Sequence, residues 1–401
     1  MIQSMLQLLD ELYPEIVEIR RDLHMHPELS HQEKRTPARI ADYLEDLGLE
    51  VKREVGGNGV VGYLQGGHPG KTIALRADFD ALPMQDEKDV PYKSKVDGVS
   101  HACGHDVHTA ALLGVAKALS KIKDELAGTI VFIHQFAEEV SPGGAEAMIA
   151  DGCLDEVDAI YGAHVWSDNH TGEILFNEGF TMAAADTFEI DIQGKGGHGA
   201  LPHLTIDPVV AASQLVVNLQ QIASRNVDPL KAAVITVGSF HSGEALNVIP
   251  DSASVKGTVR TYDEKIRKMI KDKIQKTAEA LEVQTGAAIS IDYHFGHASL
   301  YNHPAETAAL RVLAVENLPA FNVKQMPPFM GAEDFAYYLK EVPGTFFFVG
   351  GKNEEMNAIY PHHHPKFDVD ESSMTTIGKV FLLALMNHGV ISEEEQKIVE
   401  V

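Results

Sequence analysis

The chain has 401 residues, of which 44% are hydrophobic and 23% are charged, a composition typical of a globular protein. This length exceeds what a single hydrophobic core usually organises, so we expect two domains. The 33 basic and 58 acidic residues give a formal charge of −25, which disfavours nucleic acid and anionic membrane surfaces as partners. An anionic substrate would therefore need a local positive site.

The N-terminal segment and the cysteines indicate the compartment. Residues 1–23 place Asp and Glu among their apolar positions, unlike a secretory signal, and no uninterrupted apolar run reaches the roughly 18 residues of a membrane span. Cys103 and Cys153 stand in different sequence contexts, which argues against a disulfide framework and favours a reducing compartment. We therefore expect a cytoplasmic protein.

The first part of the chain alternates helical patterns with short apolar runs. A helix is expected from Ser4 to Leu23, ended by the break at His26-Pro27-Glu28. The elements expected next are buried strands at Gly59 to Leu64, Lys71 to Leu75, Gly128 to Phe136 and Asp158 to Ala163, with helices at Thr109 to Ser120 and Gly144 to Asp151. This order predicts an α/β domain, a largely parallel sheet covered by helices on both faces.

From about Ala184 the pattern changes to βαββαβ. Its expected elements are strand Thr187 to Gln193, a helix from Asp207-Pro208 to Ser224, strands Ala233 to Phe240 and Ala253 to Thr261, helix Asp263 to Glu282 and strand Ala288 to Phe295. We interpret residues 184–297 as a ferredoxin-like domain inserted into a larger domain made of residues 1–183 and 298–401. The run Glu393-Glu394-Glu395 is interpreted as a solvated helix end.

Residue types that bind metals follow three of the expected parallel strands. Asp78 and Asp80 follow the first, Glu138 and Glu139 the second, and His164 the third. Because functional groups gather at the carboxyl ends of parallel strands, these side chains are expected at one edge of the sheet. Taken singly, the glutamates are also typical of a solvated strand end, and a lone histidine of a hydrogen-bonded core residue.

A denser cluster lies between His101 and His108, where one thiol and three imidazoles occur together. Cys103 and His105, two residues apart in a Gly-flanked loop, can point at one ion. His362-His363-His364 is either a further ligand source or a solvated loop, whereas Cys153 has no such neighbours and is interpreted as structural. Thiolate, imidazole and carboxylate ligands together suit Zn²⁺, Mn²⁺, Co²⁺ or Ni²⁺ without choosing among them.

Seven motifs occur in order along nearly the whole chain. They are His24-x-His26-Pro27-Glu28, Arg76-Ala77-Asp78-Phe79-Asp80-Ala81-Leu82-Pro83, His101-Ala102-Cys103-Gly104-His105-Asp106, Ala137-Glu138-Glu139, Gly196-Gly197-His198-Gly199-Ala200, Gly331-Ala332-Glu333-Asp334-Phe335 and His363-His364-Pro365. Together they resemble the M20 metallopeptidase family, and more closely its amidohydrolase branch, which includes aminoacylases, hippurate hydrolases and plant auxin-conjugate hydrolases. The resemblance implies a di-metal α/β/α catalytic domain and an inserted lid and dimerisation domain.

The resemblance also implies two divalent metal ions per subunit. The implied ligands are Cys103, His105, Glu139, His164 and His363. Cys103 matches the position where carboxypeptidase-like relatives place a bridging aspartate. Asp78 stands where those relatives have a metal-binding histidine, so it is not counted as a ligand. Glu138 matches the family's general base, and Asp80 is expected to hydrogen-bond a ligand and fix its orientation.

In the inserted domain, the resemblance implies that His198 stabilises the oxyanion, often at the site of the other subunit, so a homodimer is expected. Asn247 and Arg260 match positions that hold the substrate carboxylate. Gly331 and Glu333 are further expected substrate contacts. His198 is otherwise typical of a surface turn, and Arg260 of a charged surface strand.

The function expected first is metal-dependent hydrolysis of the amide bond of N-acyl amino acids. A dipeptidase or carboxypeptidase-like activity uses the same chemistry, and Glu333 or Asp334 would then face the substrate ammonium. A ligand-binding module without turnover is a third alternative, although such a module has no need of a general base at Glu138.

Overall fold

A computed structural model describes residues 1–392, so the expected acidic helix end at Glu393-Glu394-Glu395 lies outside the described residues. The chain forms two compact units. Unit 1 comprises Met1–Gly179, Tyr301–Pro327 and the chain from Asp334 onwards. Unit 2 comprises Phe180–Leu300 and Pro328–Glu333. Unit 2 is thus continuous in sequence except for the short segment of six residues Pro328–Glu333.

Unit 1 is built on one large sheet, which has eight strands within residues 1–392. Their order across the sheet is β1 (Glu50–Val55), β2 (Gly59–Gln65), β4 (Ala127–Gln135), β3 (His68–Asp78), β5 (Ala159–His170), β16 (Gly344–Lys352), β6 (Glu173–Phe176) and β15 (Asn322–Gln325). The central strands β4, β3, β5 and β16 are parallel neighbours, which confirms the mostly parallel sheet. Strand β2 instead runs antiparallel to β4, because a two-residue connection, rather than a helix, joins it to β3, which is parallel to β4.

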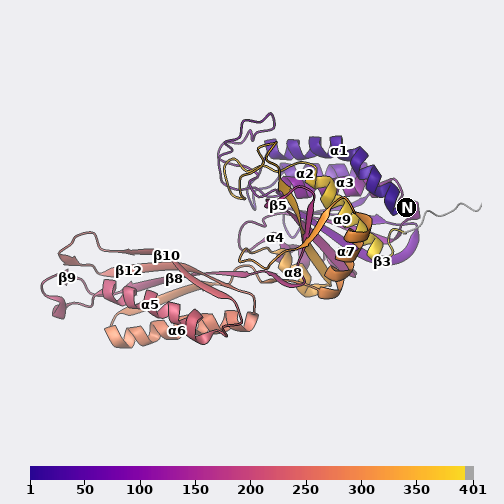
Figure 1. Ribbon diagram of the computed structural model, residues 1–401. Coiled ribbons are helices and arrows are strands. Elements are labelled where there is room, and N and C mark those ends of the chain that lie inside the picture. The colour runs from indigo at the N-terminus through magenta and orange to yellow at the C-terminus, as the bar shows by residue number, and fades with distance from the viewer. Residues whose placement is uncertain (393–401) are drawn as a thin grey trace, which may run out of the picture. The chain divides into compact units, whose positions relative to one another are not determined.

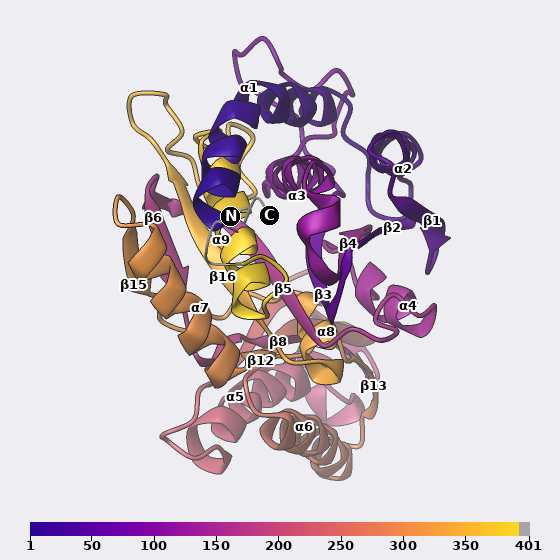
Figure 2. The ribbon, with the colours of Figure 1, turned by 90° about the vertical axis from the view of Figure 1, so that its right-hand side faces the viewer.

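Helices cover both faces of this sheet, as the alternation of phenylalanines along β16 shows. Phe347 meets Phe381 of α9 (Ser373–Asn387), whereas its neighbour Phe346 meets Phe335 of α8 (Phe335–Glu341). Successive strand residues point to opposite faces, so α9 and α8 lie on opposite sides. Figure 2 shows α1 (Ile2–Met25) and α3 (His105–Ser120) beside α9, and these three pack on one another.

Further elements of the described chain are short or lie outside the central part of the large sheet. They are α2 (Arg35–Asp46), α4 (Gly144–Ala150), α7 (Pro304–Asn317), the 3₁₀ turns Lys123–Glu125 and Pro202–Leu204, and strands β7 (Gly179–Met182) and β14 (Leu300–Asn302).

One expectation was wrong: α3 begins at His105, four residues before the expected start at Thr109. Gly104 takes a left-handed conformation, φ 99°, and starts the helix, so His105 and His108 are helical residues and not part of a loop.

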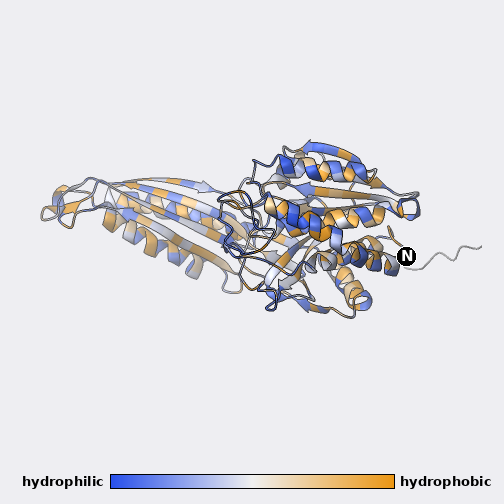
Figure 3. Ribbon diagram, turned by 90° about the horizontal axis from the view of Figure 1, so that it is seen from above, coloured by the Kyte–Doolittle hydropathy of each residue, from blue (hydrophilic) through white to orange (hydrophobic). Residues whose placement is uncertain are grey.

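Unit 2 contains a four-stranded antiparallel sheet with two helices. The strand order is β10 (Ala233–Ser242), β12 (Ser252–Thr261), β8 (Ala184–Gln193) and β13 (Ala288–His294), and helices α5 (Pro208–Asn226) and α6 (Glu264–Thr285) lie along one face (Figure 1). Asp207 and Asp263 cap these helices by accepting backbone N–H bonds. The helices show the alternating hydrophobic and hydrophilic stripes of half-buried elements in Figure 3. A two-stranded ribbon of β9 (Gly197–His198) and β11 (Val248–Ile249) extends this unit.

The buried face of α6 carries the residues that its amphipathic pattern selects. Ile266, Ile270, Ile274 and Leu281 all lie in the core of unit 2. No helix within residues 1–392 is long and apolar enough to cross a membrane.

Candidate active site

Three adjacent parallel strands of unit 1 carry candidate residues to the same edge of the sheet, although β5 (Ala159–His170) continues past His164 and does not end at Ala163 as expected. Strand β3 ends in Asp78, β4 leads into Glu138 and Glu139, and β5 carries His164 near its middle. Helix α3 begins at this edge, with Cys103 just before it. The side chains that sequence analysis selected in unit 1 therefore converge because the sheet is parallel here.

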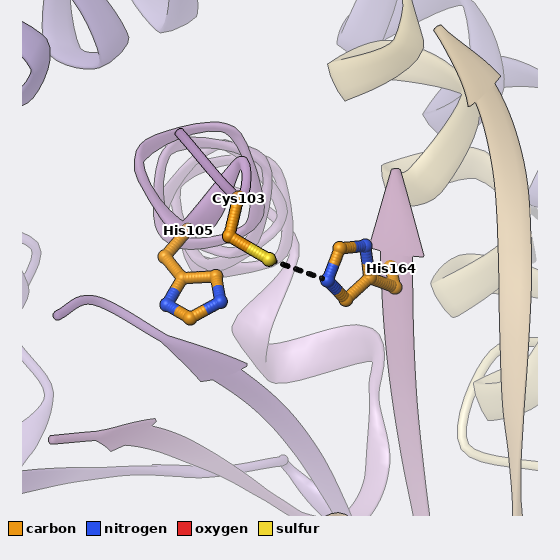
Figure 4. A group of neighbouring side chains, drawn as sticks. All are labelled: Cys103, His105 and His164. Carbon is orange, nitrogen blue, oxygen red and sulfur yellow. Dashed lines mark hydrogen bonds between the residues drawn. The ribbon is translucent and has the colours of Figure 1, made fainter. Parts of the chain in front are cut away.

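The first group of convergent atoms consists of Cys103, His105 and His164, shown in Figure 4. Their potential ligand atoms all lie within 4.8 Å of one another, and Cys103 Sγ is 3.4 Å from His164 Nε2. The His164 Nδ1–H donates to the carbonyl oxygen of Val165 at 2.6 Å. This bond fixes the tautomer and leaves the Nε2 lone pair facing the cysteine.

In His105, as in His164, one ring nitrogen is hydrogen-bonded to the protein and the other faces the site. Its Nδ1–H donates to Asp80 Oδ1 at 3.0 Å, whereas its Nε2 is buried without a hydrogen-bond partner. That Nε2 lies 3.9 Å from carboxylate oxygens of both Glu138 and Glu139. Burial by itself lowers the pKa of His105, but the negative charges of Asp78 and Asp80 outweigh burial and raise the pKa to about 10. The position therefore favours a cation strongly.

A second group is formed by Cys103, Glu139 and His363. His363 Nε2 is 3.4 Å from Glu139 Oε1, and the backbone N–H of His363 donates to the Ala102 carbonyl at 2.8 Å. The other two histidines of the triplet are turned elsewhere. His362 Nε2 accepts the N–H of Ser167 at 3.1 Å, and His364 stacks on Tyr360.

These two groups share Cys103, and a third group of His105, Glu138 and Glu139 adjoins them. Burial raises the pKa of the Cys103 thiol, and the carboxylates of Glu139 and Glu138 raise it further, so a thiolate here needs a neighbouring cation. His105 Nε2 and Glu139 Oε1 are buried without a hydrogen-bond partner, which is costly unless something binds them. The donor set of the site therefore fits divalent metal ions, which Cys103 and its neighbours would hold.

In a neighbouring polar network, which sequence analysis did not identify, the side chains instead hydrogen-bond to one another. Arg76 donates to Gln135, Asp78 and Asp334 at 2.7 to 2.9 Å. His108 donates from Nδ1 to Asp78 at 2.6 Å and accepts the N–H of Val165 at Nε2. Both nitrogens of His108 are therefore used. The sequence feature that could have revealed this network is Arg76, which stands two residues before Asp78 and therefore on the same face of one strand.

Asp80 connects two of the candidate ligands. One of its oxygens accepts the His105 Nδ1–H, and the other accepts the backbone N–H of Glu139 at 3.1 Å. The hydroxyl of Ser30 donates to the same second oxygen at 2.7 Å. A single carboxylate thus orients both a helix residue and the turn after β4.

The candidates in unit 2 fall at two separate places. His198 pairs with Val248 in the ribbon, and the N–H of Gly199 donates to the Asn247 carbonyl at 2.9 Å, so His198 and Asn247 are neighbours. Arg260 lies near the other end of β12, opposite Ala185 of β8. The carbonyl of Gly331 accepts the N–H of Ala183, and Glu333 follows in the segment Pro328–Glu333 that belongs to this unit.

The geometry of unit 1, a cluster of thiol, imidazole and carboxylate groups beside a second glutamate, defines a metal-dependent hydrolase. The model of the family described as Peptidase family M20/M25/M40 matches residues 74–387. The chain belongs to this family, and it is a hydrolase that acts on amides. The resemblance drawn from the seven motifs is thereby confirmed.

The chain is similar over almost its whole length to several other proteins. It is 51% identical over 380 residues to YhaA of Bacillus subtilis (strain 168), whose name assigns it provisionally to the amidohydrolases, covering 95% of this chain and 96% of YhaA. It is 40% identical over 390 residues to the N-acetyl-L-cysteine deacetylase of the same organism, covering 97% of this chain and 92% of the deacetylase. The solved structure of the YXEP protein of Bacillus subtilis, a dinuclear metal binding peptidase from the M20 family, superposes with a TM-score of 0.81 at 35% identity, covering 95% of this chain and 100% of that one.

Proposed function

We propose that the protein hydrolyses the amide bond of N-acyl amino acids, releasing a carboxylic acid and a free amino acid. The observation that carries the proposal is the pair of ligand groups sharing Cys103, with the carboxylate of Glu138 next to them. The similarity to a named N-acetyl-L-cysteine deacetylase supports an acyl group on the amide nitrogen. Two cysteines outside any disulfide among the described residues are consistent with the cytoplasm as the compartment.

In this proposal, Cys103, His105, Glu139, His164 and His363 hold two divalent metal ions, which are Zn²⁺, Mn²⁺, Co²⁺ or Ni²⁺. Such ions polarise an amide carbonyl and make water more acidic. His164 is in the neutral tautomer that a ligand requires, and metal binding by His105 requires the tautomer protonated at Nδ1, with the ion replacing the Nε2 proton that the nearby carboxylates favour. Asp80 keeps His105 in that tautomer.

Glu138 acts as the general base. It takes a proton from the attacking water while the water oxygen bonds to the amide carbon. As the carbon–nitrogen bond breaks, Glu138 returns that proton to the leaving amine, so the carboxylate is regenerated in each turnover. The buried position of Glu138, 7% exposed, limits competition from bulk water.

Arg260 and Asn247 are proposed to bind the substrate carboxylate, and His198 to stabilise the oxyanion. Gly331 and Glu333 complete the substrate contacts. However, Arg260 and the His198 ribbon are separated by most of β12, and eight residue steps from Ser252 to Arg260 span roughly 26 Å. One small substrate is too short to contact both ends, so a second copy of the chain must supply one of them.

This separation supports a homodimer in which His198 and Asn247 act in trans. Helix α5 offers a surface for the second copy, because Val210 and Val217, two turns apart on the helix, are 55% and 63% exposed. We expect an isologous interface formed by unit 2.

The substrate proposal is tested by measuring amine release from N-acetyl, N-benzoyl and indole-acyl amino acids and from unblocked dipeptides. The protein is first stripped of metal and then refilled separately with Mn²⁺, Zn²⁺, Co²⁺ or Ni²⁺. Metal-dependent cleavage of the blocked substrates is expected. Cleavage of only the unblocked dipeptides would identify a peptidase, and no turnover with any metal would favour a binding module.

The dimer proposal is tested by mixing two inactive variants, His198→Ala and Glu138→Gln, under conditions that allow subunits to exchange. A mixed dimer contains one site with both residues intact, so random pairing restores about a quarter of the wild-type activity. No recovery in a sample shown by light scattering to exchange would contradict action in trans.

A further inference from the structure

The turn after β4 carries both Glu138 and Glu139, and its backbone is unusual. The strand ends at Gln135, and Ala137 then adopts a left-handed conformation with φ 51°. Non-glycine residues rarely take this conformation, and it persists only where surrounding contacts hold it. Ala137 is fully buried, so its N–H needs a partner within the protein.

That partner is Glu33, a residue for which sequence analysis proposed no role. Glu33 Oε1 accepts the N–H of Ala137 at 3.0 Å, and Glu33 Oε2 accepts the side-chain amide of Asn58 at 2.9 Å. Asp80 accepts the N–H of Glu139 at 3.1 Å. Carboxylates from two other segments thus hold the backbone on both sides of Glu138.

Glu33 is itself held in place by the segment that precedes α2. Glu28 accepts the backbone N–H groups of Lys34, Arg35 and Thr36 at 2.8 to 3.1 Å, which satisfies the open start of this helix. The side chain of Glu33 is almost completely buried, 1% exposed. A fixed backbone and a buried side chain give Glu33 little freedom to leave Ala137.

We propose that Glu33 is a positioning residue for Glu138: by holding the N–H of Ala137, it fixes the turn that aims the general base and its neighbour Glu139. This inference rests on the proposed function of Glu138. A displacement of about 1 Å at a reacting group can lower a rate about a hundredfold, so a contact one residue away from the base matters for turnover.

The role requires only an acceptor oxygen. Burial raises the pKa of Glu33 to about 7, and both the carboxylate and the carboxylic acid retain an oxygen that can accept the Ala137 N–H. An amide also has such an oxygen, whereas a thioether of similar length is a poor acceptor. Both Glu33→Gln and Glu33→Met alter the contact with Asn58, but only Glu33→Gln keeps an oxygen that can accept the Ala137 N–H, so the pair tests that acceptor.

Two measurements are made on these variants. The first is hydrogen exchange of the backbone amides in residues 136–139 of the metal-free full-length chain, which does not depend on catalysis. The second is steady-state kinetics at saturating Mn²⁺, with bound metal measured. Glu306→Gln is the control, because Glu306 accepts the hydroxyl of Tyr161 at 2.6 Å, away from the ligand groups.

We expect Glu33→Met to exchange at least about tenfold faster in residues 136–139 and to lose about 10- to 100-fold in kcat, with KM changed less than about threefold. Glu33→Gln and the control should stay within about threefold of wild type in both measurements. The separation of kcat from KM, and the rescue by glutamine, distinguish positioning from a merely structural role.

Unchanged exchange in Glu33→Met would overturn the proposal, as would faster exchange with an unchanged kcat per metal-loaded chain. Equal losses in the glutamine and methionine variants would also overturn it, because the acceptor would then be irrelevant. If the wild type turns over none of the substrates, the proposed function fails separately, and the exchange measurement with a Mn²⁺ titration still decides whether Glu33 holds the turn.

Discussion

Two polar clusters lie side by side in unit 1 and use similar residue types for different purposes. In the open cluster, of Cys103, His105, Glu139, His164 and His363, two buried atoms, His105 Nε2 and Glu139 Oε1, have no hydrogen-bond partner. In the closed network, of Arg76, Asp78, His108, Gln135 and Asp334, the charges and ring nitrogens are paired.

The difference shows that residue type alone does not identify a metal site. His105 and His108 are three residues apart on one helix, both are buried, and both donate Nδ1–H to an aspartate. Only the second nitrogen distinguishes them, since His108 Nε2 accepts a backbone N–H and His105 Nε2 accepts none. The comparison therefore predicts loss of metal or turnover from changes in the open cluster, and loss of stability from changes in the closed network.

The largest effect is expected where the base meets the open cluster. Glu138→Gln should retain metal but lose about three orders of magnitude or more in kcat, because both proton transfers pass through this carboxylate. Metal content and kcat are measured together. Glu146→Gln, an exposed carboxylate on α4, is the control and should be unchanged. Near-normal turnover in Glu138→Gln would refute its role.

Next in size is the removal of the shared ligand. Cys103→Ala should lose bound metal, measured by elemental analysis after dialysis, since both ligand groups include this thiol. Cys153→Ala removes the other thiol, which is buried outside both groups, and should keep its metal. Equal metal contents in the two variants would contradict a cysteine shared between ions.

A substitution in the closed network should lower the free energy of unfolding. Arg76→Met leaves the carboxylates of Asp78 and Asp334 without their guanidinium partner, and breaking such a buried pair costs about 3–5 kcal/mol. Urea unfolding measures this difference. Arg53→Met is the matched control, because Arg53 also contacts two carboxylates but on the surface, where water screens the pair and the loss of stability should be much smaller.

The smallest effect concerns acid stability. Burial lowers the pKa of His134, beside Thr109 at the closed network, to about 3. The unfolded chain, with a His pKa of about 6.5, therefore binds the proton more readily between these values. Stability from this group is complete above pH 6.5 and falls as the pH decreases toward 3, by up to about 1.4 kcal/mol per pH unit.

Urea unfolding of the metal-free chain at pH 7, 6 and 5 measures this slope. His134→Gln should reduce the slope by about one proton, whereas His68→Gln, at an exposed position, should leave it nearly unchanged. An identical slope in wild type and His134→Gln would show that His134 is already accessible to protons in the folded protein.

Much of the fold followed from local patterns in the sequence. The period of apolar residues identified the strands of the large sheet and the buried face of α6, because burial on one face imposes that period directly. The caps at Asp207 and Asp263 are similarly local, since a side chain satisfies N–H groups only two or three residues away. The motifs, which are short and ordered along the chain, were sufficient to indicate the family.

Only the tertiary structure determined which polar residues keep a lone pair available for a metal. The motif histidine His24 donates to Asp106 at 2.7 Å within unit 1, and Glu28 serves as a helix cap, although both belong to a motif shared with a metal-dependent family. Glu33 and Ala137 are separated by 104 positions, so no local pattern predicts their contact. Hydrogen bonds between distant segments determine which lone pairs are left for a metal, and a sequence does not contain those distances.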